Sequence, residues 1–126
     1  MNIPEKLLYT KEHEWVKKED WKVTIGITDF AQSQLGDIIF LELPEVGQKI
    51  VSGEPFGEIE AVKTVSELYA PINGTVIEIN EDLEDNPDNI NQDCYGSGWI
   101  VKVEFDGETL NSDNLLNHKD YGLIIV

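Results

Sequence analysis

The chain has 126 residues, 40% of them hydrophobic and 27% charged, and its 25 acidic residues outnumber nine basic ones, all lysine, to give a formal net charge of −16. Such a negative surface repels the phosphates of nucleic acids and anionic lipids, which excludes nucleic acid and membrane surfaces as partners. The charge suits brief, electrostatically steered docking on basic patches of other proteins, with solubility alone as the simpler alternative.

The sequence lacks a targeting segment and has a single cysteine, and both features bear on the compartment in which the protein works. The N-terminal MNIPEKLLYTKEHEW has neither the apolar segment of a signal peptide nor the arginines of a mitochondrial presequence, and no apolar run is long enough to span a bilayer. The single cysteine, Cys94, rules out an internal disulfide and a multi-cysteine metal site, and no histidine near it supports a nucleophile. We therefore expect a bacterial or archaeal cytoplasm, or a mitochondrial matrix if a presequence has been removed.

Strand patterns dominate the chain. Alternation of apolar and polar residues, or a short apolar run, predicts five strands. In chain order these are 21–27 (WKVTIGI), 37–43 (DIIFLEL), 56–61 (FGEIEA), 75–80 (TVIEIN) and 98–105 (GWIVKVEF). The first should place Val23, Ile25 and Ile27 on one face, whereas the second is a more continuous apolar run and predicts a buried strand. A turn at Ser52–Gly53 precedes the third.

One short helix is expected over 28–36. Thr28 is a candidate N-cap, and Asp29 lies in the first turn, where the helix dipole favours a carboxylate. Gly36 stands just past the end, as glycine commonly does at a helix C-terminus.

A second helix is expected near the C-terminus, in NSDNLLNHKDY (111–121), with Ser112 as its cap and Leu115–Leu116 as packing residues. The final KDYGLIIV carries four aliphatic residues, which either pack on the sheet or expose an adhesive surface. Between the strands, the Asn- and Asp-rich segment 80–98 predicts a long loop.

Two Pro-x-x-Gly turns, 44–47 and 71–74, each precede an alternating stretch and hint at two similar halves. Many short strands with helices at the margins predict a mainly β fold, a small barrel or sandwich, in one domain.

A reversal of the chain is expected at Lys63. Ile59 and Ala61 face one way before it, and Leu68 and Ala70 resume that face after it, so the chain must turn within 62–65. None of these residues is the Gly, Asn, Asp or Pro that turns normally use. Local preference and chain course disagree here, and such disagreements tend to mark functional sites.

A solitary exposed lysine offers an amine on a flexible stem, and amide formation would convert it into an uncharged arm. On an ordered hairpin such an arm could visit several active sites from a defined starting point. The alternative is an ordinary surface lysine paired with Glu60 or Glu67, and the pattern alone leaves both open.

Four stretches carry a family resemblance: YTKEHEWV, VTIGITDFAQSQLGDIIFLELPEVG, EAVKTVSELYAPINGTVIEIN and GWIVKV. Together they resemble the H protein of the glycine cleavage system, in register from Tyr9 to about Val103. Biotin carriers place methionine on both sides of the modified lysine and 2-oxo-acid dehydrogenase lipoyl domains place aspartate before it. Here the neighbours are Val62 and Thr64.

The resemblance implies a flattened barrel-sandwich hybrid of two quasi-symmetric antiparallel sheets. It also implies one lipoyl-carrier domain over 1–126, with a core at about 21–105 and a helical tail at about 110–126. Lipoic acid would be attached as an amide to Lys63, with Val62 and Thr64 recognised by the lipoate ligase or lipoyl transferase that attaches it. No metal is implied.

By the same resemblance the protein is a carrier and not an enzyme. Its lipoyl arm would take an aminomethyl group and electrons from a pyridoxal-phosphate glycine decarboxylase. An aminomethyltransferase and dihydrolipoamide dehydrogenase would then act on the arm. An H-like carrier serving lipoyl relay or another lipoate-dependent system is the alternative. An independent enzyme is disfavoured because it would need a nucleophile–base pair or a metal cluster, and the chain has only two histidines, His13 and His118, and one cysteine, Cys94.

The resemblance places Glu14 and Glu67 in a cleft that shelters the loaded arm. A carboxylate there would accept charge-assisted hydrogen bonds from the protonated amine. Glu12 stands where the family often has a small hydroxyl residue, and each of these acids could instead be a solvated surface group. His13 beside Glu14 is a weak metal signal, and we expect packing or capping from it.

Overall fold

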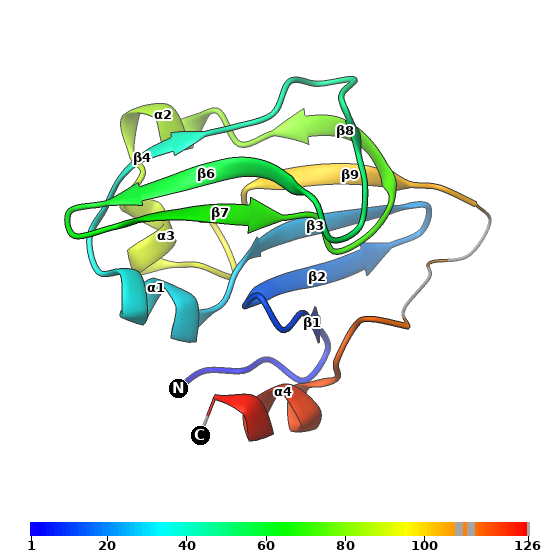
Figure 1. Ribbon diagram of the computed structural model, residues 1–126, viewed down its shortest axis with the longest axis horizontal. Coiled ribbons are helices and arrows are strands. Elements are labelled where there is room, and N and C mark those ends of the chain that lie inside the picture. Colours follow the sequence, from blue (N-terminus) through cyan, green and yellow to red (C-terminus); the bar gives the residue numbers. More distant parts are fainter. Residues whose placement is uncertain (108–109, 111–112, 126) are drawn as a thin grey trace.

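The computed structural model describes residues 1–107, 110 and 113–125, and these form two antiparallel sheets with short helices (Figure 1). The large sheet has the order β1-β2-β3-β9-β8-β5, with strands Leu8–Tyr9, Glu14–Glu19, Lys22–Ile27, Val101–Phe105, Gly74–Ile79 and Lys49–Ile50. The small sheet has the order β4-β6-β7, with strands Ile38–Glu42, Pro55–Ala61 and Val65–Tyr69. The helices are α1 (Asp29–Leu35), α2 (Asp82–Asp85), α3 (Asn89–Gln92) and α4 (His118–Ile124). The predicted mainly β fold of two antiparallel sheets is therefore confirmed.

The main core contains side chains from both sheets. Val23, Ile25 and Ile27 are buried together, as their alternation predicts. The opposite face of β3 is covered as well, because the indole of Trp15 lies against Gly26, where an added Cβ would come within 2.7 Å of the ring. A second apolar cluster of Leu7, Tyr9, Trp15 and Tyr121 therefore packs outside the large sheet, where α4 meets β1.

The expectation of a buried strand over 37–43 is wrong in part. Ile38 and Leu41 are buried, but Ile39 and Phe40 remain 49% and 58% exposed. A bulge between Ile38 and Phe40 shifts the pairing with β6. An antiparallel sheet that covers the core with one face leaves its other face in water, whatever the side chains there.

The expectation of a long loop over 80–98 is also wrong in part. Two single-turn helices, α2 and α3, bury Leu83 and Ile90 in the core. The side-chain amide of Asn80 donates to the carbonyls of Ser97 and Trp99, at 2.9 and 2.7 Å. Isolated apolar residues in a polar stretch anchor these turns, and single-turn helices are too short to show periodicity.

Helix α1 has the predicted boundaries. The Thr28 hydroxyl accepts from the Ala31 N–H at 3.2 Å, and the N–H of Gly36 (φ 77°) donates to the Gln32 carbonyl at 3.0 Å. No helix in the described part of the chain exceeds seven residues or could cross a membrane.

The C-terminal helix begins later than expected. Its cap is Asn117, whose side chain accepts from the Asp120 N–H at 2.8 Å, and the predicted cap Ser112 lies outside the described residues. Leu116 is extended instead, because its N–H and carbonyl bond to Tyr9 at 2.7 and 2.8 Å. Both expectations for the tail hold in part: Ile125 packs on the second cluster, whereas Leu123 and Ile124 are exposed.

The two Pro-x-x-Gly segments differ in geometry. Gly47 has φ 95° in a turn, whereas Gly74 is a buried strand residue of β8. A Cβ at Gly74 would lie 2.5 Å from the Glu104 carbonyl oxygen on β9, so close strand contact and not a turn requires glycine there.

Candidate functional site

Lys63 stands at the tip of a hairpin formed by β6 and β7, at the left end of Figure 1. Glu60 pairs with Val65, and the Ala61 N–H donates to the Thr64 carbonyl at 2.8 Å, so the chain reverses over 62–64. Among the described non-glycine residues only two elsewhere have positive φ. The bend therefore uses ordinary backbone conformations, which explains why it needs no glycine or asparagine.

The tip is ordered but open to solvent. The Val62 N–H donates to the Asp37 carbonyl at 3.1 Å, which ties the bend to the segment before β4. Lys63 and Thr64 are exposed, and the side chain of Val62 is 67% exposed. Within the described ranges the ion pairs are Lys17–Glu19 and Lys49–Asp106, so the pairing of Lys63 with Glu60 or Glu67 does not form.

A cavity of about 320 Å³ lies between α1 and β7 and begins three residues past Lys63, at Ser66. Glu12, Glu14 and Glu67 all line this acidic cavity, so the structure brings the three carboxylates of the sequence analysis together. The remaining wall is largely apolar. Its apolar residues are Ile27, Phe30, Ala31, Leu35, Ile59 and Leu68.

Glu14 is 1% exposed, so it is not a solvated surface acid. Its Oε1 accepts from the Thr10 hydroxyl at 2.9 Å, and its Oε2 accepts from the backbone N–H of Tyr69 at 2.9 Å. Burial raises the pKa of Glu14 to about 8, against the lowering effect of these two hydrogen bonds, and the charge of Glu12 adds to the rise. The carboxyl group is thus poised to exchange a proton near neutral pH.

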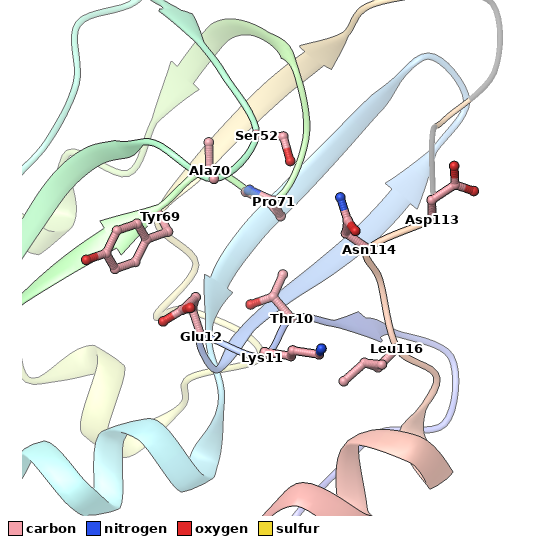
Figure 2. Close-up of a pocket in the computed structure, with 11 residues that line it drawn as sticks. Thr10, Lys11, Glu12, Ser52, Tyr69, Ala70, Pro71, Asp113, Asn114 and Leu116 are labelled. Carbon is pink, nitrogen blue, oxygen red and sulfur yellow. The ribbon is translucent and has the colours of Figure 1, made fainter.

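Glu12 and Glu67 are exposed at the rim of the acidic cavity. Glu67 accepts a hydrogen bond from the Tyr69 hydroxyl, and this bond together with its charge raises the pKa of Tyr69. A second cavity of about 570 Å³ shares Glu12 with the first and continues past Tyr69 to the segment before α4. Figure 2 shows Glu12 and Tyr69 on one side of this opening and Asn114 on the other.

Thr10 and Tyr69 belong to the site, although neither was predicted from the sequence. In a strand, residues two apart face the same way, so the alternation that turns Glu67 outward also turns Tyr69 outward. The position of Tyr69 could therefore have been predicted from the sequence. No local sequence pattern identifies Thr10 as a site residue, because its role is to donate a hydrogen bond to the Glu14 carboxyl, which folds back onto it.

His13 has a packing role, as expected. It adopts φ 68°, and its Nδ1 lies 2.9 Å from the Tyr121 hydroxyl, which in turn lies 2.7 Å from the Thr28 hydroxyl. Burial lowers the pKa of His13, which favours the neutral ring. In the part of the chain that the structure describes, no three His, Cys, Asp or Glu side chains are placed to hold a metal ion.

Sequence comparison decides the family. A sequence model described as Glycine cleavage H-protein matches residues 7–125. The chain belongs to the glycine cleavage H-protein family. Members are non-catalytic carrier components of the glycine cleavage system and generally carry a lipoyl group, which confirms the predicted family, its function and the assignment as a carrier.

Relatives support the same assignment over nearly the full length. The glycine cleavage system H protein of Geobacillus thermodenitrificans is 55% identical over 99% of this chain and 98% of that protein. The H protein of Geobacillus sp. (strain WCH70) is 57% identical over 96% of this chain and 94% of its own length. The crystal structure of an H protein from Mycobacterium marinum superimposes with a TM-score of 0.88 at 39% identity, covering 95% and 96% of the two chains.

Proposed function

We propose that this H protein carries its lipoyl group as an amide on Nζ of Lys63 and moves the aminomethyl group and reducing equivalents of glycine on that arm. The observation that carries the proposal is a lone lysine, exposed and without an ion pair among the described residues, at the tip of an ordered hairpin. The dithiolane supplies the chemistry when bound, accepting the one-carbon unit and electrons. The protein chain positions the lipoyl arm and shields the carried group from water.

The residues beside the hairpin fit such an arm. Strand β7 covers five residues, about 13 Å at the usual rise, and the acidic cavity follows it from Ser66 to Leu68. The cavity has an apolar wall for a hydrocarbon chain and three carboxylates for a cationic end group. Site composition of this kind, apolar with a few polar groups, is typical of ligand cavities.

Glu14 is proposed to bind the protonated amine of the carried group. An ammonium beside Glu14 would favour its carboxylate form and oppose the burial that raises its pKa to about 8. Loading the cavity near neutral pH would then release part of a proton from Glu14. Glu67 and Glu12 at the rim would draw the cation in, while the Tyr69 N–H and the Thr10 hydroxyl hold the Glu14 carboxyl in place.

The proposed partners are the other components of the system. They are a pyridoxal-phosphate glycine decarboxylase, an aminomethyltransferase and dihydrolipoamide dehydrogenase, with a lipoate ligase or lipoyl transferase that recognises Val62 and Thr64 beside Lys63. We take the whole chain as one carrier domain, working in a bacterial cytoplasm as befits bacterial relatives and a lone unpaired cysteine.

Intact mass and peptide mapping of protein from a lipoate-synthesising host test the attachment. We expect the mass of one lipoyl group on Lys63. Lys63→Arg should fold with an unchanged midpoint of thermal unfolding but remain unmodified, because a guanidinium is not acylated in place of the amine. An unmodified Lys63 while other lipoyl proteins of the host are modified would overturn the proposal. Failure of the lipoylated chain to support glycine oxidation would point to a different lipoate-dependent system.

A further inference from the structure

The outer face of the small sheet carries an exposed apolar strip next to Lys63. Phe40, Glu60 and Val65 lie side by side across β4, β6 and β7, and the two apolar members are 58% and 54% exposed. Ile39 and Val62 are also about half exposed or more, at 49% and 67%. Exposed apolar side chains gathered around one functional residue are typical of an interaction surface.

The next row across the same face is a line of three glutamates. Glu42 pairs with Glu58, and Glu58 pairs with Glu67, and all three are exposed. They share a shallow hollow of about 260 Å³. Like charges directly opposite one another destabilise a sheet. Charges on an edge strand protect against strand addition, but β6 is the central strand, so edge protection does not account for Glu58.

Charge is distributed unequally between the two sheets. The strands of the small sheet carry four glutamates (Glu42, Glu58, Glu60 and Glu67) and no basic residue. The strands of the large sheet carry five lysines, which are Lys17, Lys18, Lys22, Lys49 and Lys102. The large-sheet strands also carry four glutamates (Glu14, Glu19, Glu78 and Glu104), so their formal net charge is +1 against −4 for the small sheet. Of the two sheets, the small one is therefore attracted more strongly to a basic surface.

We propose that this outer face, defined by Phe40, Glu42, Glu58, Glu60 and Val65, is a docking surface for the enzyme that loads the arm, the pyridoxal-phosphate glycine decarboxylase. The complementary patch is an apolar rim bordered by lysine or arginine side chains at the mouth of the channel that the arm enters. The inference rests on the proposed function, since only an arm on Lys63 brings this face against that channel.

A second copy of the chain is the competing occupant, and charge opposes it. A two-fold pairing places the same patch on both subunits, so the glutamate row of one copy would face either that row or the apolar strip of the other, and neither supplies a positive charge. Unpaired like charges at a contact cost binding energy, whereas a basic partner gains from each glutamate.

The test uses lipoylated chain, verified by intact mass, with the pyridoxal-phosphate glycine decarboxylase of the same organism. Two variants probe the face: Phe40→Ser, and the double variant Glu42→Gln with Glu58→Gln, which keeps side-chain shape. Glu67 is left intact because it lines the acidic cavity. A matched double variant, Glu78→Gln with Glu104→Gln, removes the same charge from the large sheet. The readout is release of carbon dioxide from carboxyl-labelled glycine against carrier and salt concentration.

We expect Phe40→Ser to raise KM for the carrier about fivefold or more, as truncation of an apolar anchor commonly does. The Glu42/Glu58 variant should raise KM about tenfold at low salt, and the difference should shrink as salt screens the charges. The matched variant should stay within about twofold of the parent, and kcat should hold throughout.

Unchanged KM in both face variants, with the arm attached and the parent active, would overturn the docking surface and leave the proposed function standing. A parent that carries no lipoyl group, or carries one without supporting decarboxylation, would count against the proposed function instead. Sedimentation equilibrium adds a separate outcome. Dimerisation of the parent that Phe40→Ser abolishes would assign the face to a second copy and refute a basic partner.

Discussion

Glu14→Gln should change how the stability of this protein depends on pH. In the native structure the Glu14 carboxyl is buried, with the Thr10 hydroxyl on one oxygen and the Tyr69 N–H on the other. Burial raises its pKa from the ordinary 4.5 to about 8. Glutamine keeps the shape of the side chain but cannot ionise. Its one oxygen can accept from the Tyr69 N–H, and its amide nitrogen would then donate to the Thr10 hydroxyl in place of the bond that Glu14 accepts there.

The sign follows from proton binding. A raised native pKa means that the folded state holds this proton more tightly than the unfolded state. The stabilisation is complete below pH 4.5 and is lost as pH rises to about 8. Each pKa unit corresponds to about 1.4 kcal/mol, so the full rise from 4.5 to about 8 corresponds to about 5 kcal/mol. About 4 kcal/mol of this is lost by pH 8, where half of the native carboxyl groups are ionised.

Urea denaturation followed by tryptophan fluorescence, at intervals from pH 4.5 to 8.5, measures the effect. The parent and Glu14→Gln should have similar unfolding free energies at the acidic end, where both side chains are neutral. At pH 8 the variant should be the more stable by about 4 kcal/mol. Other titrating groups, His13 included, are common to both proteins and cancel in the difference.

Glu12→Gln is the matched control, because its carboxyl is exposed at the rim of the same cavity. It should weaken the pH dependence of stability only slightly, because the charge of Glu12 is the smallest of the contributions to the pKa of Glu14. If Glu14→Gln and the parent keep a constant difference in unfolding free energy across the range, the carboxyl does not titrate near neutral pH. The role proposed for its proton would then be refuted.

A substitution at Gly26 and chemical labelling of Cys94 test the packing of the fold around the site. Gly26→Ala should lower the unfolding free energy by about 1–3 kcal/mol, because the added Cβ would lie 2.7 Å from the Trp15 indole. Gly122→Ala in α4 is the control. It should be neutral or stabilising, because among the described residues the only atom near its Cβ belongs to Ile3, at 3.7 Å. Urea denaturation compares them, and equal losses would contradict the contact. Burial raises the pKa of the Cys94 thiol to about 12, so a thiol reagent at pH 8 should label native protein far more slowly than protein in urea; equally fast labelling would show that the thiol is accessible.

Much of the fold was predictable from local sequence. Alternation with a period of two identified β3 and β9, and side-chain capping located α1 between Thr28 and Gly36. The reversal at Lys63 followed from matching the inward faces on either side of it. These features depend on neighbours in the chain, since strand faces and helix caps are set within a few residues.

Burial of the remaining site residues was decided only by the tertiary structure. Phe40 belongs to an apolar run, yet it faces water because the small sheet covers the core with one face. Glu14 looks like any surface acid, yet it is enclosed because β7, far along the chain, brings the Tyr69 N–H to its carboxylate. Solvent access and pKa are properties of the assembled environment, and contacts between distant strands create that environment.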